Sequence, residues 1–92
     1  MDILVVSPEY FPEEILGELR SFANVDAKKL SREELLNEID KYTAILTRID
    51  IKFDKELLKR ARNLKVIATA TTGIDHIDVE YAKEKGIEVV SA

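Results

Sequence analysis

The chain has 92 residues, a length that fits one small domain built around a single core. Its 14 Lys and Arg against 18 Asp and Glu give a net charge of −4, with the two signs interspersed, which argues against a nucleic-acid or anionic-membrane surface. Because the chain has no cysteine it has no disulfide or thiolate metal site, and because no basic-then-apolar leader is present we expect a cytoplasmic protein.

Short apolar runs alternate with helical patterns along the chain, which predicts repeated strand-helix-strand units and a parallel sheet. The run ILVV (3–6) fits a strand covered on both faces. Pro12 is then expected to open a helix whose apolar face carries Ile15, Leu19 and Phe22. The polar stretch NVDA (24–27) fits a strand at a sheet edge.

Capping signals locate the three later helices. Ser31 and Glu34 have the spacing of a capping box. Asp54 and Asp78 are the N-cap candidates of the next two helices. Gly86 suits the left-handed residue that ends the last helix.

Three further strands lie between and after these helices, in AILT (44–47), KVIATA (65–70) and IEVV (87–90). The simplest assembly is an α/β, flavodoxin-like domain: a five-stranded parallel sheet in the order 2-1-3-4-5 with four helices, lacking the final helix of that fold. Three strands would then have one uncovered face, occupied by Ile45 or Ile67. A homodimer that buries this face is therefore expected.

Candidate chemistry lies beyond the carboxyl ends of the strands, where ligands bind in such sheets. The stretch ATTGIDHID (70–78) leaves three interpretations open: a cradle of backbone amides for an anion, a metal or acid/base cluster of Asp75, His76 and Asp78, or a plain connection. The metal site would lack a second histidine, and we expect a solvated His76. Arg48, after the third strand, could pair with a carboxylate or lie over neighbouring apolar groups.

Gly73 carries two interpretations of its own: it lets the backbone approach a ligand closely, or it simply makes the turn. No G-x-G-x-x-G and no Walker lysine motif follows any of the expected strands. A nicotinamide cofactor therefore has no recognisable binding site in these residues.

The stretch LKVIATATTGIDHIDVEYAKEKGIEVVSA (64–92) resembles the D-isomer-specific 2-hydroxyacid dehydrogenase family, which includes phosphoglycerate dehydrogenase and glyoxylate reductase. The G-x-D-x-I-D element, the alanine four residues after its last aspartate and the following G-I-x-V coincide with the family, and DILVVSPEY and YTAILTR fit it as well. The resemblance implies that residues 1–92 are the first part of a substrate-binding domain, with the cofactor-binding domain absent.

The resemblance also implies an NAD-dependent hydride transfer to and from a 2-hydroxy acid. The arginine, glutamate and histidine that catalyse it belong to the nucleotide-binding domain of the family, and none of them maps onto this sequence. Backbone amides around Thr71, Thr72 and Gly73 would face the substrate carboxylate. For this chain alone we expect weak binding of a small 2-hydroxy or 2-oxo acid, no bound NAD and no catalysis.

Arg48 matches an arginine often found after the third strand in the family, whereas Ile49 and Ile51 stand where many members have Ser and Thr. Two classes of function remain open. The chain is either a fragment of a D-2-hydroxyacid dehydrogenase or a non-catalytic flavodoxin-like module that serves as an interaction or folding unit.

Overall fold

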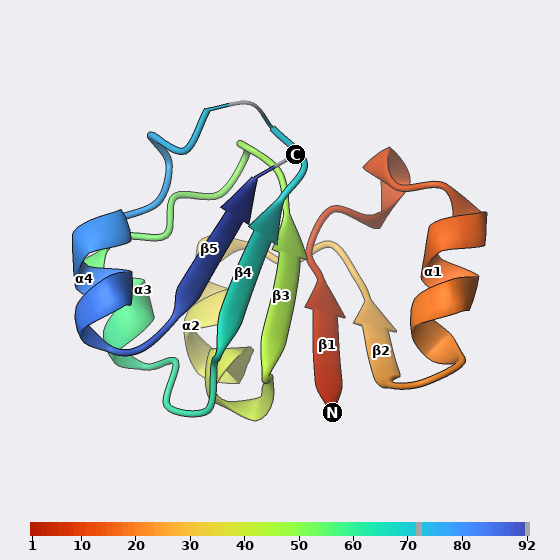
Figure 1. Cartoon of the computed structure of the whole chain (residues 1–92), viewed down its shortest axis with the longest axis horizontal. Helices are drawn as coiled ribbons and strands as arrows, with labels where there is room; N and C mark the ends of the chain where they lie inside the picture. The colour runs from red at the N-terminus through yellow and green to blue at the C-terminus, as the bar shows by residue number, and fades with distance from the viewer. Residues whose placement is uncertain (72, 92) are drawn as a thin grey trace.

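Five parallel strands form one sheet in the order β2-β1-β3-β4-β5 in the computed structural model, which describes residues 1–71 and 73–91 (Figure 1). The predicted strand order is confirmed. The strands are β1 (Asp2–Val5), β2 (Asn24–Ala27), β3 (Ala44–Thr47), β4 (Val66–Thr69) and β5 (Glu88–Ser91).

The helices divide unequally between the two faces of the sheet. Side chains from α2 (Arg32–Glu38), α3 (Lys55–Lys59) and α4 (Val79–Glu84) enter one core cluster with the strands, whereas α1 (Glu13–Arg20) stands apart beside β2 (Figure 1). Two short 3-10 helices, η1 (Pro8–Tyr10) and η2 (Ile39–Lys41), complete the connections. The four predicted α-helices are therefore confirmed.

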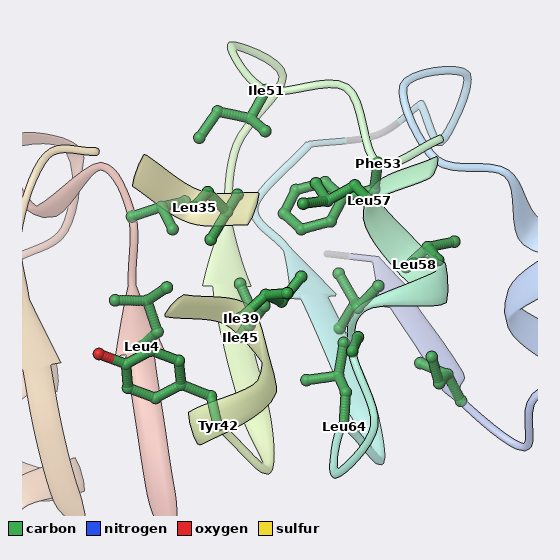
Figure 2. Packing of buried hydrophobic residues seen from close by; sticks show 14 of the residues in the cluster. Leu4, Leu35, Ile39, Tyr42, Ile45, Ile51, Phe53, Leu57, Leu58 and Leu64 are labelled. Atoms are coloured by element: carbon green, nitrogen blue, oxygen red, sulfur yellow. The ribbon is translucent and has the colours of Figure 1, made fainter. Parts of the chain in front are cut away.

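The core lies between the sheet and α2, α3 and α4. Leu4, Ile45 and Ile67 stand side by side in register on β1, β3 and β4, and all three are buried. Leu35 and Phe53 pack in the same cluster, both fully buried (Figure 2). Because side chains alternate along a strand, this row defines the covered face of the sheet.

The opposite face is the uncovered one, and our assignment of Ile45 or Ile67 to it was wrong, since both face the helices. The row on the uncovered face of β3, β4 and β5 consists of the residues one position further along each strand: Leu46, Ala68 and Val90. Leu46 and Ala68 are half-buried and Val90 is 45% exposed. The expectation of three apolar strands with one bare face holds, with the alternation shifted by one residue.

The buried face of α1 also differs from the prediction. Leu16 is the buried residue of this helix, whereas Ile15 is 43% exposed and Phe22 is 65% exposed. The helix ends at Arg20, before the periodic pattern reaches Phe22, and Pro12 occupies the N-cap in an extended conformation instead of the first helical position. A helix that lies against the edge of a sheet buries only a narrow stripe.

The predicted caps are present. Ser31 and Glu34 form both hydrogen bonds of a capping box. The side chains of Asp54 and Asp78 each accept a hydrogen bond of 3.1 Å from the amide three residues further on. Gly86 has φ 77°, the left-handed conformation predicted for it.

Arg32 joins the start of α2 to the start of α3. Its guanidinium donates to both carboxylate oxygens of Asp54, at 2.7 and 2.9 Å, and to Glu56 at 3.0 Å. The hydrogen bond from Arg32 holds the pKa of Asp54 below its usual range. A charged Asp54 therefore serves at once as helix cap and as ion-pair partner.

We predict that this ion pair makes stability depend on pH. Because the pKa of Asp54 is lower in the folded chain, its contribution is present above the unfolded pKa of about 4 and is lost as pH falls through the folded value. Arg32→Gln should lower the free energy of unfolding by about 0.5–1 kcal/mol at neutral pH, a small amount because both partners are over one-third exposed. Urea denaturation should show the difference from wild type shrinking as the pH falls below the unfolded pKa of about 4.

Arg20→Gln is the control for that measurement, because the Arg20–Glu13 pair is more exposed than the Arg32–Asp54 pair. It should change the free energy of unfolding by less than about 0.5 kcal/mol. An Arg32→Gln deficit that is independent of pH would contradict the assignment to a charged Asp54.

The single-sided core predicts a sharp contrast between two truncations. Leu35→Ala should lower the free energy of unfolding by about 2–5 kcal/mol, because Leu35 is fully buried and a cavity would remain. Ile49→Ala should change it by less than about 0.5 kcal/mol, because Ile49 is 65% exposed. Thermal or urea unfolding measures both, and equal losses would contradict this description of the core.

Candidate functional site

Hydroxyl side chains end the strands at the carboxyl edge of the sheet. Thr47, Thr69 and Ser91 stand in register at the ends of β3, β4 and β5. Ser7, which follows β1, is fully buried and donates a 2.6 Å hydrogen bond to Asp50 in the loop after β3. The sequence places Ser7, Thr47 and Ser91 at strand ends, where ligands bind in such sheets, but we assigned no role to their hydroxyl groups and did not single out Thr69. A hydroxyl residue at the end of four strand patterns is a signal that could have found this set.

Two of the loops at this edge are fastened together by their backbones. The amide of Phe53 donates to the carbonyl of His76 at 2.7 Å, and the amide of Asp78 donates to the carbonyl of Phe53 at 2.8 Å. Phe53 and Ile77 thereby form an isolated parallel bridge, and both side chains are buried. The loop after β3 and the loop after β4 therefore share one anchored end.

The loop after β4 contains a chain of side-chain hydrogen bonds. The Thr71 hydroxyl donates to the carbonyl of Gly73 at 2.7 Å, and the oxygens Oγ1 of Thr69 and Thr71 lie 2.9 Å apart. His76 Nε2 lies 3.0 Å from Thr69 Oγ1, and the His76 side chain is only 7% exposed. Our expectation of a solvated His76 was wrong, because the ring is buried against the end of β4.

The other predicted site residues lie around this loop. Arg48 follows β3 and is half-buried. The amide of Ala70 donates to the carbonyl of Thr47 at 3.0 Å, so the segments that carry Arg48 and Thr71 leave adjacent points of the sheet. Thr72, which we also predicted to contact the substrate, lies outside the described residues.

Crowding does not explain why residue 73 is a glycine. A Cβ placed on Gly73 would have no heavy atom within 4 Å. Gly73 is exposed to solvent.

A metal centre gains no support from the geometry. Asp78 caps α4, and the Nε2 atom of His76 is engaged by Thr69. Across residues 1–71 and 73–91, no group of three or more histidine, aspartate or glutamate side chains is arranged to hold a metal ion.

A groove of about 370 Å³ opens beside the same edge, between the start of α1 and the uncovered face of the sheet. Phe11 and Ile15 line it on one side, and Leu46, Ala68 and Val90 line it on the other. Its walls are mainly apolar.

None of the helices in the described part of the chain is long and apolar enough to cross a bilayer.

Comparison with known proteins identifies the family. The profile of the D-isomer specific 2-hydroxyacid dehydrogenase catalytic domain matches residues 3–92. The D-3-phosphoglycerate dehydrogenase of Archaeoglobus fulgidus is 42% identical over 94 residues, which cover 100% of this chain and 18% of that protein. The glyoxylate reductase of Thermofilum pendens is 48% identical over 59 residues, or 64% of this chain and 17% of that protein.

Solved structures give the same assignment. A crystal structure of a Pyrococcus horikoshii protein superposes with a TM-score of 0.93 at 33% identity, covering 99% of this chain and 27% of the other. The D-lactate dehydrogenase of Aquifex aeolicus, complexed with NAD and lactic acid, superposes with a TM-score of 0.83 at 27% identity, covering 100% of this chain and 28% of the other. The chain thus spans less than a third of the length of these relatives.

The family profile, the sequence identities and the shared order of strands agree with one another. The chain belongs to the D-isomer specific 2-hydroxyacid dehydrogenase family and corresponds to a part of its catalytic domain.

Proposed function

We propose that residues 1–92 form the substrate-binding portion of an NAD-dependent D-2-hydroxyacid dehydrogenase and contribute the site for the substrate carboxylate. The observation that carries the proposal is Gly73, an exposed glycine whose missing Cβ leaves open space. Such a position allows another molecule to approach the main chain closely. The substrate class is a small 2-hydroxy or 2-oxo acid.

The carboxylate would bind to backbone amides of the segment Thr71 to Gly73. Consecutive N–H groups in a turn form a concave donor surface that suits an anion. Arg48, which leaves the sheet beside this loop, is the candidate for a charged contact, because a guanidinium matches the two oxygens of a carboxylate. The Aquifex aeolicus relative, which was crystallised with lactic acid, has this fold.

NAD does not fit the residues of this chain. Within residues 1–92, no G-x-G-x-x-G follows β1, β2, β3 or β4, so none of these strands leads into a glycine-rich turn that could hold a pyrophosphate at a helix start. We propose that the cofactor, the hydride transfer and the catalytic arginine, glutamate and histidine belong to the cofactor-binding domain of a longer protein. The 92-residue chain by itself would not reduce 2-oxo acids, and we propose a cytoplasmic location for it.

A titration of the ¹⁵N-labelled chain with D-lactate tests the carboxylate site. The amide resonances of Thr71, Thr72 and Gly73 should shift at lower lactate concentrations than other resonances do. Their shifts should saturate with weak affinity. Gly73→Ala should weaken binding at least threefold, because its methyl group would occupy the space left for the ligand. NADH, followed by fluorescence, should show no saturable binding.

Gly17→Ala is the matched control, because a Cβ there also meets nothing within 4 Å and Gly17 lies inside α1. It should leave lactate binding unchanged and raise stability by up to about 1 kcal/mol. Shifts confined to residues far from the loop, or equal effects of the two substitutions, would rule out this site.

The uncovered sheet face favours a second role, self-association, and we propose that the 92-residue chain forms a homodimer. Leu46, Ala68 and Val90 form an apolar row there, and the groove beside them is lined by few polar groups. Leaving aliphatic side chains in water forgoes about 25 cal/mol per Å². A second copy packed with two-fold symmetry is the simplest way to bury this face.

Sedimentation equilibrium should detect a dimer of this chain at micromolar concentration. Val90→Asp should shift the equilibrium toward monomer at least tenfold, because it places a charge on the uncovered face. Ile49→Asp, in an exposed residue that does not line the groove, should not shift it. A well-folded wild-type monomer under these conditions would refute the dimer.

A further inference from the structure

The buried histidine stands at the base of the candidate carboxylate loop without a role in the proposed function. The backbone of His76 is held by the hydrogen bond from Phe53, and its ring lies against the end of β4. Its Nε2 atom contacts Thr69, whereas its Nδ1 atom is buried and has no hydrogen-bond partner among the described residues. A buried polar atom without a partner calls for an explanation.

The direction of each hydrogen bond in the loop follows from the atoms involved. The Gly73 carbonyl can only accept, so the single proton of the Thr71 hydroxyl is used there. Thr71 Oγ1 must then accept from Thr69, whose own proton is used in turn. Thr69 Oγ1 can therefore only accept from His76, so Nε2 of the ring carries a proton.

The other neutral tautomer is disfavoured by the same contacts. If Nδ1 carried the only ring proton, Nε2 would have to accept the proton of the Thr69 hydroxyl. The proton of Thr71 is already used at the Gly73 carbonyl, so Oγ1 of Thr69 and Oγ1 of Thr71 would lie 2.9 Å apart with no proton between them. The Nδ1 proton would also be buried without an acceptor, which costs free energy. The bare Nδ1 atom is thus the consequence of a relay that runs in one direction, from the ring to the Gly73 carbonyl.

We propose that His76 is a positioning residue of the carboxylate loop: its Nε2–H donates to Thr69 and thereby supports the relay through Thr69 and Thr71 that holds the peptide plane after Gly73. This inference rests on the proposed function of the loop. A trans peptide points its N–H away from its own carbonyl oxygen. With the Gly73 carbonyl held on Thr71, the Ile74 N–H points away from the Thr71 hydroxyl and can be offered to an anion.

The relay is set before any ligand arrives, which lowers the cost of binding. A loop that is already in its bound conformation does not lose further conformational freedom when the ligand binds. Without the Thr69 donor, the Thr71 hydroxyl is no longer held by a second partner, so its hydrogen bond to the Gly73 carbonyl should weaken and the peptide plane should gain freedom. Carboxylate affinity should then fall even though no atom of His76 or Thr69 needs to touch the ligand.

The first test needs no substitution. In a long-range ¹H–¹⁵N spectrum of the chain labelled at histidine, Nε2 of His76 should show the shift of a protonated ring nitrogen and Nδ1 that of a bare one. The reverse assignment would overturn the proposal, and so would a rapid mixture of the two tautomers.

Substitution of Thr69 tests the effect on the loop. Thr69→Val keeps the shape but removes the hydroxyl, and should move the ¹³C resonance of the Gly73 carbonyl and the amide resonance of Ile74. It should weaken D-lactate binding by roughly three- to tenfold, the effect of losing about one hydrogen bond. Thr69→Ser, which keeps the hydroxyl, should restore both readouts toward wild type.

A matched pair at the ring distinguishes positioning from packing. His76→Gln retains an amide donor near the place of Nε2, whereas His76→Met fills a similar volume without a donor. We expect Gln to preserve more of the carboxylate affinity than Met at comparable urea stability. Equal affinities for the pair, or a Thr69→Val variant that loses stability but keeps wild-type affinity, would mean a purely structural role and would overturn the proposal.

The two proposals fail differently. If wild-type chain shows the Nε2–H tautomer and the Thr69→Val shifts at Gly73 but no response to D-lactate, the relay is supported and the carboxylate function is refuted. If lactate binds at the loop and the tautomer is reversed, the function is supported and the positioning role of His76 is refuted.

Discussion

Phe53 joins the two loops that carry the candidate site. Its side chain is fully buried in the core, and its backbone pairs with the loop after β4 on both its amide and its carbonyl. Asp54 and Asp78, which cap α3 and α4, immediately follow the two bridged residues Phe53 and Ile77. One backbone bridge therefore aligns two helix starts and holds the His76 carbonyl in place.

With this bridge in place, the candidate site has a buried base and an exposed loop above it. Below the loop, His76 and Thr69 are buried, and their hydrogen bonds leave the Thr71 hydroxyl little choice of partner. Above them, Gly73 is exposed with open space around its Cα. The division is consistent with the proposed recognition of an anion by the backbone, which requires oriented donors and a ligand side without obstructing side chains.

One face of the sheet is covered and the other is largely uncovered, just as the loop after β4 has a buried side and an exposed side. Ile45 and Ile67 belong to the core cluster that contains side chains of α2, α3 and α4. Leu46 and Ala68, their neighbours in sequence, line an apolar groove beside α1. All four residues are apolar, so the chain is built to be covered on both faces. The described residues supply that cover fully on one face only, and the other face is where we propose that a second copy packs.

Much of the architecture was determined locally by the sequence. The capping residues act within one turn of the chain, and all of them have the predicted roles. They are Ser31 with Glu34, the aspartates at the other two helix starts, and Gly86. Strand positions and order followed as well, because apolar runs separated by single helices allow few right-handed arrangements. The motif in residues 64–92 was also enough to name the family.

Tertiary structure decided what depends on contacts between distant residues. The period of two in a strand does not say which alternate row meets the helices, so Ile45 and Leu46 could not be told apart by composition. Leu16 rather than Ile15 is buried because of where α1 meets the sheet edge. The sequence predicted a solvated His76. Only the folded chain brings its ring against Thr69 and its carbonyl to the amide of Phe53, and Phe53 is 23 residues away from His76 along the chain. Capping acts over three or four residues and is readable from the sequence, whereas burial of a ring depends on packing that no local pattern encodes.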